Sequence, residues 1–482
     1  MSYRLFKKNI GKFIFPLSVF LFTPILGHSQ SYTDNGFTVI KPSKDSKLIY
    51  VSNSKGNDKN TCLTEAAPCK TIAAGVKKMR NGYPDHLYLK RGDVWRDQSL
   101  SNLTSGRSSK EPAVISFYGN SGKRPKLEVS ATSNIHKKGI QFVHFIGLEI
   151  SAYKMDPKNS AFTGTNRGNV VMLGAKENLL FEDNVFNYVE VVIQSWEGGT
   201  PKNLTFRRNI WTGSYYNKSS LDRNTRPSNM YIDGVDGITI EENVFDHGGW
   251  NASVPNAGAN MFNHNIYIQH NVNGDKVALR RNIITRASSH GAQLRAGGLA
   301  EDNFFGRNAV GFLIGYGSEP LKTGVKAHAI NNVISEGHSM VKGLDACKGT
   351  NLCTPAVWGI EFNVNGAADW QAHGNIVSLL SPEDKQWSTK YKSLVKKSLP
   401  GLENPATKSS NNISWKWEST TQGTNQKYPA PDRTLADYNA SLGGKKSFDA
   451  FMTVVLNRQP QTWDERYTAT AINNYIRAGF GK

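Results

Sequence analysis

Two short segments of this sequence place proton-carrying side chains at matching positions. HNIYIQ spans residues 264–269 and HGAQLR spans residues 290–295, so both open with a histidine, and Arg295 closes the second. An imidazole titrates near neutral pH and serves as a general acid or base. A guanidinium keeps its charge and pairs with carboxylates. These residue types predict proton transfer on an anionic substrate, provided that the fold brings the two segments together.

Both segments alternate apolar and polar residues with a period of two, which predicts β-strands with one face on a core. A third segment, NMYID at 229–233, shows the same alternation. If the three strands stack in register, their outward side chains form three rows. The predicted rows are Asn229, Asn265 and Gly291; Tyr231, Tyr267 and Gln293; and Asp233, Gln269 and Arg295.

These rows and a nearby loop define the candidate site. The candidate catalytic residues are His264, Tyr267, His290 and Arg295. The candidate substrate contacts are Tyr231, Asp233, Asn265, Gln269 and Gln293, with His247 and Trp250 from the loop DHGGW at 246–250. Structural alternatives stand beside each role. A histidine that begins a strand is often a turn residue, tyrosine favours strands in general, and Arg295 could pair with Asp233 at the surface.

The elements that must position these residues come from a repeated phrase. It reads LLFEDNVF at 179–186, LTFRRNIW at 204–211, ITIEENVF at 238–245 and VALRRNII at 277–284, with weaker copies at 299–305 and 328–334. Its asparagines are Asn184, Asn209, Asn243, Asn282, Asn303 and Asn332. Strand-like units that recur at a minimum spacing of 21 residues predict a coil of parallel β-structure. An asparagine at a fixed corner tolerates a tight turn and bonds its neighbours in the stack.

This pattern resembles the right-handed parallel β-helix of the pectate-lyase-like proteins, with its internal asparagine ladder, over residues 45–380. The segments 47–79, 87–97 and 117–127 resemble the opening strand, capping helix and first turns of such coils. The resemblance implies an all-β fold, a single-stranded right-handed parallel β-helix with an N-terminal capping helix. We expect a signal peptide at 1–29, the β-helix domain at 30–380, and a loop and mostly helical C-terminal capping region at 381–482, packed on or along the coil.

Two coils are longer than the repeat requires. The surplus residues lie at 212–228 and 246–263, directly before the strands of the candidate site. Long loops on an economical repeat are usually functional. We therefore expect them to form the wall of a groove.

The net charge and the N-terminal segment limit which classes of partner are expected. The formal net charge is +19, and residues 1–29 hold four of the cations and no acid, which leaves +15 after cleavage. The short apolar run after those cations predicts export to the periplasm or the medium rather than a membrane span. Outside the cytoplasm an acidic polysaccharide is the expected polyanion, in place of nucleic acid. We expect a soluble, monomeric protein.

Four cysteines form two close pairs, Cys62/Cys69 and Cys347/Cys353. In an oxidising compartment each pair can close a short loop. Neither has the spacing or the neighbouring histidines of a zinc site. The segment NVNGD at 271–275 is a weak calcium-loop pattern that a polar turn explains better. We therefore expect no metal and no cofactor, with calcium as the alternative.

The resemblance implies action on polysaccharides, with uronate lyases and C5-epimerases prominent among basic members. Arg295, with Asn265 or Gln293, would neutralise the substrate carboxylate, while His264, His290 and Tyr267 would carry protons. The sequence does not divide acid and base among these three. A glycoside hydrolase would need clustered carboxylates, and only Asp233 and Glu190 are placed on these rows. A non-catalytic polysaccharide-binding coil is the third hypothesis.

Overall fold

A computed structural model describes residues 36–39, 41–120, 122–130, 139–164, 168–196, 199–217, 226–269, 274–316, 325–340, 357–363, 369–381, 398–399, 407–417 and 427–482. The predicted signal peptide, the Cys347/Cys353 pair and nearly all of the helical prediction at 381–399 lie outside these ranges.

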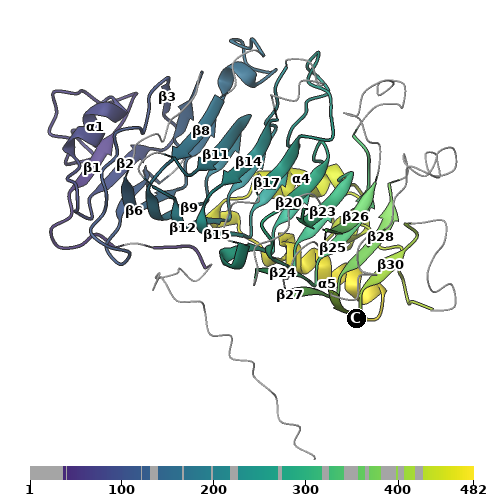
Figure 1. The fold of residues 1–482 in the computed structure, drawn as a ribbon. Helices are drawn as coiled ribbons and strands as arrows, with labels where there is room; N and C mark the ends of the chain where they lie inside the picture. The colour runs from purple at the N-terminus through teal and green to yellow at the C-terminus, as the bar shows by residue number, and fades with distance from the viewer. Residues whose placement is uncertain are drawn as a thin grey trace, which may run out of the picture.

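The described chain winds through three sheets in which every strand pairing is parallel, as the resemblance implies (Figure 1). The 12-stranded sheet contains β1 (Leu48–Val51), β2 (His86–Lys90), β4 (Ala113–Tyr118), β6 (Ile140–Ile146), β9 (Lys176–Glu182), β12 (Lys202–Arg207), β15 (Asp236–Glu241), β18 (Val277–Arg280), β21 (Gly298–Glu301), β24 (Lys326–Ile330), β27 (Asp369–His373) and β29 (Thr407–Ser410). The 11-stranded sheet contains β3 (Val94–Arg96), β5 (Lys126–Glu128), β7 (Glu149–Ser151), β10 (Val185–Asn187), β13 (Ile210–Thr212), β16 (Val244–Asp246), β19 (Ile283–Thr285), β22 (Phe304–Gly306), β25 (Val333–Gly337), β28 (Ile376–Leu380) and β30 (Ile413–Trp415).

The third sheet carries the candidate site and has seven strands. These are β8 (Gly168–Leu173), β11 (Val189–Gln194), β14 (Ser228–Asp233), β17 (His264–Ile268), β20 (His290–Leu294), β23 (Val310–Gly315) and β26 (Trp358–Asn363). Successive strands of one sheet are one coil apart along the chain. The fold is therefore a parallel β-helix, and the prediction of an all-β coil is confirmed.

Each copy of the repeated phrase supplies two strands rather than one. In LLFEDNVF, β9 ends at Glu182 and β10 begins at Val185, so the corner falls on Asp183 and Asn184. Asp183 has the left-handed backbone, with φ of 57°. The asparagine therefore does not adopt the tight-turn conformation itself, because the residue before it does.

The asparagine ladder is confirmed. The backbone N–H and the side-chain Nδ2 of Asn184 both donate to Oδ1 of Asn209, at 2.9 and 3.0 Å. The same pattern continues to Asn375 and Asn412, beyond the predicted copies. Every asparagine from 184 to 375 in this ladder is buried. Buried amides without partners would be costly, so the ladder holds adjacent coils at a single register.

Charges alternate beside the ladder. From Asn184 to Asn303, the two residues before each ladder asparagine are acidic in one coil and basic in the next, as in FEDN, FRRN, IEEN and LRRN. The pairs that result include Arg207–Glu182, Arg208–Glu242 at 2.6 Å and Arg281–Glu241 at 3.1 Å. A slip by one coil would place like charges together, so this alternation also favours the observed stacking.

The interior of the coil is filled by stacked apolar side chains. Phe145, Phe181 and Phe206 stack with ring centroids 4.5 and 4.7 Å apart. On the neighbouring sheet, Trp211 stacks on Phe245 at 4.5 Å. Equivalent positions of successive coils lie about 4.8 Å apart, so identical residue types at one position produce continuous stacks.

The N-terminal end is closed by α1 (Ile72–Lys78), as predicted. Thr71 caps the helix, and Ile72 and Val76 are buried against the first coil. A Cβ on Gly75 would lie 2.5 Å from Val51, so this glycine permits the close approach of helix and strand. The Cys62–Cys69 disulfide is formed in the preceding loop.

The C-terminal region packs along the coil. The helices α3 (Leu435–Ser441), α4 (Phe448–Leu456) and α5 (Ala469–Gly479) cover the outer face of the 11-stranded sheet (Figure 1). Phe451 and Ile472 join one apolar cluster with Val244 and Ile283 of that sheet. The coil itself runs past residue 380, because β29 and β30 continue two of its sheets. Within the described ranges, no helix is long and apolar enough to cross a membrane.

Candidate active site

The register predicted for the candidate site is confirmed. Tyr231 lies opposite Tyr267, and Tyr267 lies opposite Gln293, on three successive strands. Ile266 and Ile268 are fully buried in the core. The backbone N–H of Arg295 donates to the carbonyl of Ile268, so the pairing continues beyond the strand ends.

The prediction that Asn229 and Asn265 face outward is wrong. Asn265 is fully buried; its Nδ2 donates to the carbonyl of Thr285, and its Oδ1 accepts from Gly248 N and Asn229 Nδ2. A Cβ on Gly291, which follows in the same row, would lie 2.7 Å from Phe305 in the core. Strand alternation does not hold here because the chain is still turning the corner. Asn265 stabilises the fold and does not face substrate.

The two histidines come together with Tyr267. The ring centroids of His264 and His290 are 5.0 Å apart, and those of His264 and Tyr267 are 5.3 Å apart. His264 is 2% exposed and Tyr267 is 3% exposed. The expectation of a solvated face is therefore wrong for these side chains, which form the floor of the site. Within the described ranges, His264 Nδ1 and the Tyr267 hydroxyl have no hydrogen-bond partner.

Arg295 lies over this floor. Its guanidinium carbon is 4.9 Å from the centroid of the Tyr267 ring and 3.9 Å from that of Tyr316. Its Nε donates to Oε1 of Gln293 at 3.1 Å. No ion pair joins Arg295 to Asp233 in the described part of the chain, so the structural alternative for this arginine does not apply. Its cationic group is held by aromatic faces and an amide, and no carboxylate of the described residues pairs with it.

His290 is oriented from both sides. Its Nδ1 lies 3.3 Å from Gln293 Nε2 and 3.0 Å from Ser289 Oγ. The amide nitrogen of Gln293 can only donate, so Nδ1 of His290 accepts and the ring proton belongs on Nε2. Nε2 in turn lies 4.0 Å from Oε2 of Glu361.

Glu361 was missed by sequence reasoning. It lies on β26, in the row of Tyr231, Tyr267 and Gln293, separated from Gln293 by Leu313. The alternation in WGIEFN at 358–363 was a usable signal. The copy of the repeated phrase that follows this strand, around Asn375, departs from the pattern of the other copies, so the sequence alone does not align the strand with the site.

Burial sets the protonation states of this cluster. It lowers the pKa of His264 well below 6.5, with His290 and Arg295 adding to the effect, and lowers the pKa of His290 to about 3. It raises the pKa of Glu361 to about 7 and also raises that of Tyr267. Both imidazoles and the phenol are therefore neutral near pH 7. The approach of His290 to Glu361 is accordingly not an ion pair.

The remaining row residues form the rim. Tyr231, Asp233 and Gln269 are half-buried. The Tyr231 and Tyr267 rings meet at 5.4 Å. Burial, with the nearby Asp233 carboxylate, raises the pKa of Tyr231 to about 12. These side chains reach the surface.

His247 and Trp250 are not part of this cluster. His247 Nδ1 is 2.8 Å from Asp246, and Trp250 Nε1 donates to the carbonyl of Arg286 at 2.8 Å. Both anchors belong to the end of the 11-stranded sheet, where Arg286 also pairs with Asp246 at 2.7 Å. These contacts hold the loop DHGGW against the coil.

The two long loops meet above the site, as far as they are described. The Arg226 guanidinium lies 4.9 Å from the Phe262 ring, which links the loop before β14 to the loop before β17. The charge of Arg226 also lowers the pKa of His264 and Tyr267. The described ends of these loops thus form a wall with a second cation, while residues 218–225 lie outside the described ranges. Across the described chain, no three His, Cys, Asp or Glu side chains gather as metal ligands.

No family model and no curated protein matches this sequence. Among solved structures, a rhamnogalacturonan lyase is similar over 76% of this chain and 87% of its own, with 12% identity and a TM-score of 0.47. A GH136 lacto-N-biosidase from Eubacterium ramulus covers 77% and 68%, with 14% identity and a TM-score of 0.37. A mannuronic acid specific family 6 lyase from human gut microbiota covers 89% and 99%, with 8% identity and a TM-score of 0.31. At these low identities, evidence for the chemistry of this chain comes from its own side chains.

Proposed function

We propose that this protein is a polysaccharide lyase that cleaves an anionic, uronate-containing polysaccharide by β-elimination. The observation that carries the proposal is the convergence of two neutral imidazoles and a neutral phenol beside Arg295. These groups supply a base, an acid and a carboxylate partner in one place.

Arg295 has the role of neutralising the substrate carboxylate. The C5 proton of a uronate is weakly acidic while the adjacent carboxylate keeps its full charge. A guanidinium that faces this carboxylate stabilises the negative charge that develops when the proton leaves. Arg226 in the wall adds a second positive charge near His264.

His264 is the base in this proposal. Its Nδ1 has no partner within the described ranges, whereas the Nδ1 of His290 is occupied by Gln293 and Ser289. Arg295 and Arg226 contribute to the lowered pKa of His264. A bound carboxylate offsets these cations, so substrate binding raises the basicity of the imidazole when it is needed.

Tyr267 is the acid. His264 takes the C5 proton, the electron pair forms the C4–C5 double bond, and the C4–O bond breaks. The leaving glycosidic oxygen receives the phenolic proton of Tyr267. Burial keeps the pKa of Tyr267 raised, so the phenol holds that proton until the bond breaks.

The spacing of carboxylates disfavours a glycoside hydrolase. Glu190 on β11 is buried and accepts a hydrogen bond from Ser228 N. The other described acids on these rows, Asp233 on β14 and Glu361 on β26, are four strand steps apart. At about 4.8 Å per step, their backbones are about 19 Å apart. A hydrolase pair requires carboxyl groups about 5–9.5 Å apart.

The test uses a panel of polygalacturonate, rhamnogalacturonan, alginate and a neutral glucan. We expect ultraviolet absorbance from an unsaturated product with at least one acidic polymer and none with the glucan. Arg295→Ala should lower kcat/KM by about 10² or more, because the carboxylate loses its partner. Lys408→Ala, which removes an exposed cation from β29 of another sheet, serves as the control. New reducing ends without ultraviolet absorbance would overturn the proposal.

A further inference from the structure

A tryptophan is held in solvent at the corner that follows β11. Trp196 is 58% exposed, which is more than any other large apolar side chain in the described ranges. Its N–H donates to Gly199 O at 3.2 Å, and Gly199 N–H donates back to its carbonyl at 3.0 Å. An isolated apolar residue on a surface is ordinary. The exposure of Trp196 alone therefore does not indicate a ligand.

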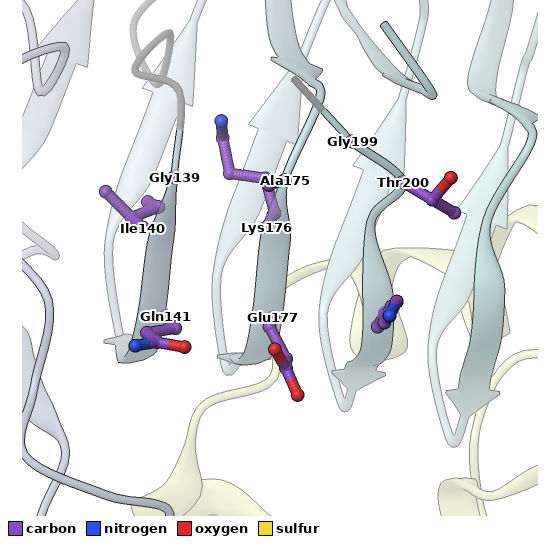
Figure 2. A pocket seen from close by; sticks show the side chains of 9 residues that line it. Gly139, Ile140, Gln141, Ala175, Lys176, Glu177, Gly199 and Thr200 are labelled. Atoms are coloured by element: carbon purple, nitrogen blue, oxygen red, sulfur yellow. The ribbon is translucent and has the colours of Figure 1, made fainter. Parts of the chain in front are cut away.

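A pocket of about 250 Å³ lies next to Gly199, the residue that pairs with Trp196. Gly199 lines it together with Gln141, Glu177 and Lys202 from three neighbouring strands (Figure 2). Gln141 is opposite Glu177, and Glu177 is opposite Lys202. An amide, a carboxylate and an ammonium group therefore lie side by side.

The chemistry of this pocket suits a sugar ring. Its volume equals that of about eight water molecules at about 30 Å³ each, which is enough for one pyranose unit. The three polar groups can accept and donate hydrogen bonds to hydroxyls, and Lys202 can pair with a carboxylate. The exposed indole of Trp196, whose backbone pairs with Gly199 at the edge of the pocket, offers an apolar face of the kind that stacks on the C–H face of a sugar.

The position of the pocket relates it to the candidate active site. Gln194, two residues before Trp196, is opposite Asp233. Ser195 N–H donates to the carbonyl of Asp233 at 3.0 Å. From β11 to β20, which leads into Arg295, there are three strand steps, or about 14 Å at the usual spacing. A polysaccharide along this corner can reach both places at once.

We propose that Trp196 and this pocket bind a sugar unit of the polysaccharide at a distance from the bond that is cleaved. The inference rests on the proposed function for the identity of the polymer, but not for the binding itself. The indole carries the apolar face of the ring, and Gln141, Glu177 and Lys202 hold its polar edge. This contact increases affinity for long chains and does not take part in the chemical step.

The test compares Trp196→Ala with Trp196→Phe, and uses Val454→Ala as a control that shortens an exposed apolar side chain on α4. Affinity electrophoresis in gels containing polygalacturonate, rhamnogalacturonan or alginate measures binding directly. We expect Trp196→Ala to weaken binding of the retained polymer by about tenfold, with Trp196→Phe intermediate and Val454→Ala unchanged. Where turnover is observed, KM for the polymer should rise while kcat is kept, and the effect should shrink on short oligosaccharides.

Binding and turnover separate the two proposals. A polymer that is bound through Trp196 but yields no unsaturated product would overturn the lyase and support the remote sugar site. If Trp196→Ala binds the polymer as tightly as the wild type, the remote site is wrong, whatever the activity. If the wild-type protein binds none of the three polymers, the remote site is likewise wrong.

Discussion

At the scale of single residues, the two histidines begin equivalent strands but occupy different environments. His290 is oriented by Gln293 and Ser289, whereas His264 Nδ1 has no partner in the described ranges. His264 is buried and the His290 side chain is only 12% exposed, so their replacement by alanine would leave a cavity as well as remove a proton carrier. Glutamine is the better replacement because it keeps most of the volume and a polar end.

The first residue-scale prediction separates the histidines. His264→Gln should lower kcat by about 10²–10⁴ with KM largely kept, because a general base acts in the chemical step. His290→Gln should lose far less. Steady-state kinetics on the cleaved polymer measure both, and circular dichroism confirms folding. Near-normal turnover of both variants would show that this cluster is not the active site.

The second residue-scale prediction concerns pH and Glu361. Burial raises its pKa from 4.5 to about 7, so between these values the folded state binds more protons than the unfolded state. Stability is therefore lost as the pH rises through this window. In the Glu361→Gln variant the glutamine side chain cannot ionise. The free energy of unfolding of this variant at pH 8 should therefore exceed that of the wild type by up to about 3 kcal/mol.

At pH 4 the Glu361→Gln variant should match the wild type. Urea unfolding at both pH values gives the comparison. Glu301→Gln, which removes a carboxylate paired at the surface with Arg280, controls for the loss of charge. A difference between Glu361→Gln and the wild type that does not change with pH would contradict the assignment.

At the scale of elements, the asparagine ladder decides how the coils stack. Asn282 donates to Ile240 O and Asn303 Oδ1, and its own Oδ1 accepts from Asn243. Its replacement leaves buried polar groups of three coils without partners. The alternating acidic and basic pairs next to the ladder also favour the observed stacking, because each charged pair is attracted to the oppositely charged pair of the adjacent coil.

We therefore predict that Asn282→Ala lowers the free energy of unfolding by about 2–4 kcal/mol, since each unsatisfied buried group costs about 1–3 kcal/mol. Urea denaturation followed by circular dichroism measures it. Asn457→Ala, at an exposed helix end, removes an asparagine with one local hydrogen bond and should cost less than about 1 kcal/mol. Equal costs for the two variants would mean that the ladder adds no special stability.

At the scale of the whole molecule, the coil is a rod with one side covered. The helices α3, α4 and α5 cover the 11-stranded sheet, whereas the candidate active site lies on the seven-stranded sheet and the proposed sugar pocket on strands of the 12-stranded sheet. The formal net charge of +19 favours a polyanion as the partner.

This charge predicts a strong dependence on salt. Affinity for the bound acidic polysaccharide should fall steeply between about 50 mM and 500 mM NaCl, because exposed ionic contacts are screened over a Debye length of about 10 Å at 0.1 M. Affinity electrophoresis at several salt concentrations measures this. Binding that is unchanged across the series would exclude an electrostatic contribution and favour stacking and hydrogen bonds alone.

The sequence by itself determined the coil, the ladder and the register of the candidate strands. These features depend on period-two alternation and on an asparagine repeated at one corner, and both are local patterns that stacking merely repeats. The rows Tyr231, Tyr267 and Gln293, and Asp233, Gln269 and Arg295, could be predicted for the same reason.

Only the tertiary structure decided which side chains face substrate. Alternation fails where a chain turns a corner, so Asn265 turned inward although its position in the strand predicted the opposite. Burial depends on what covers a face: His290, Arg295 and the charge of Arg226 lie near His264 and Tyr267, which form a floor. Glu361 and the pocket beside Trp196 are assembled from coils separated by insertions of unequal length. Because the insertions differ in length, sequence spacing does not show which residues of distant strands align. The alignment is seen only in the stacked coils.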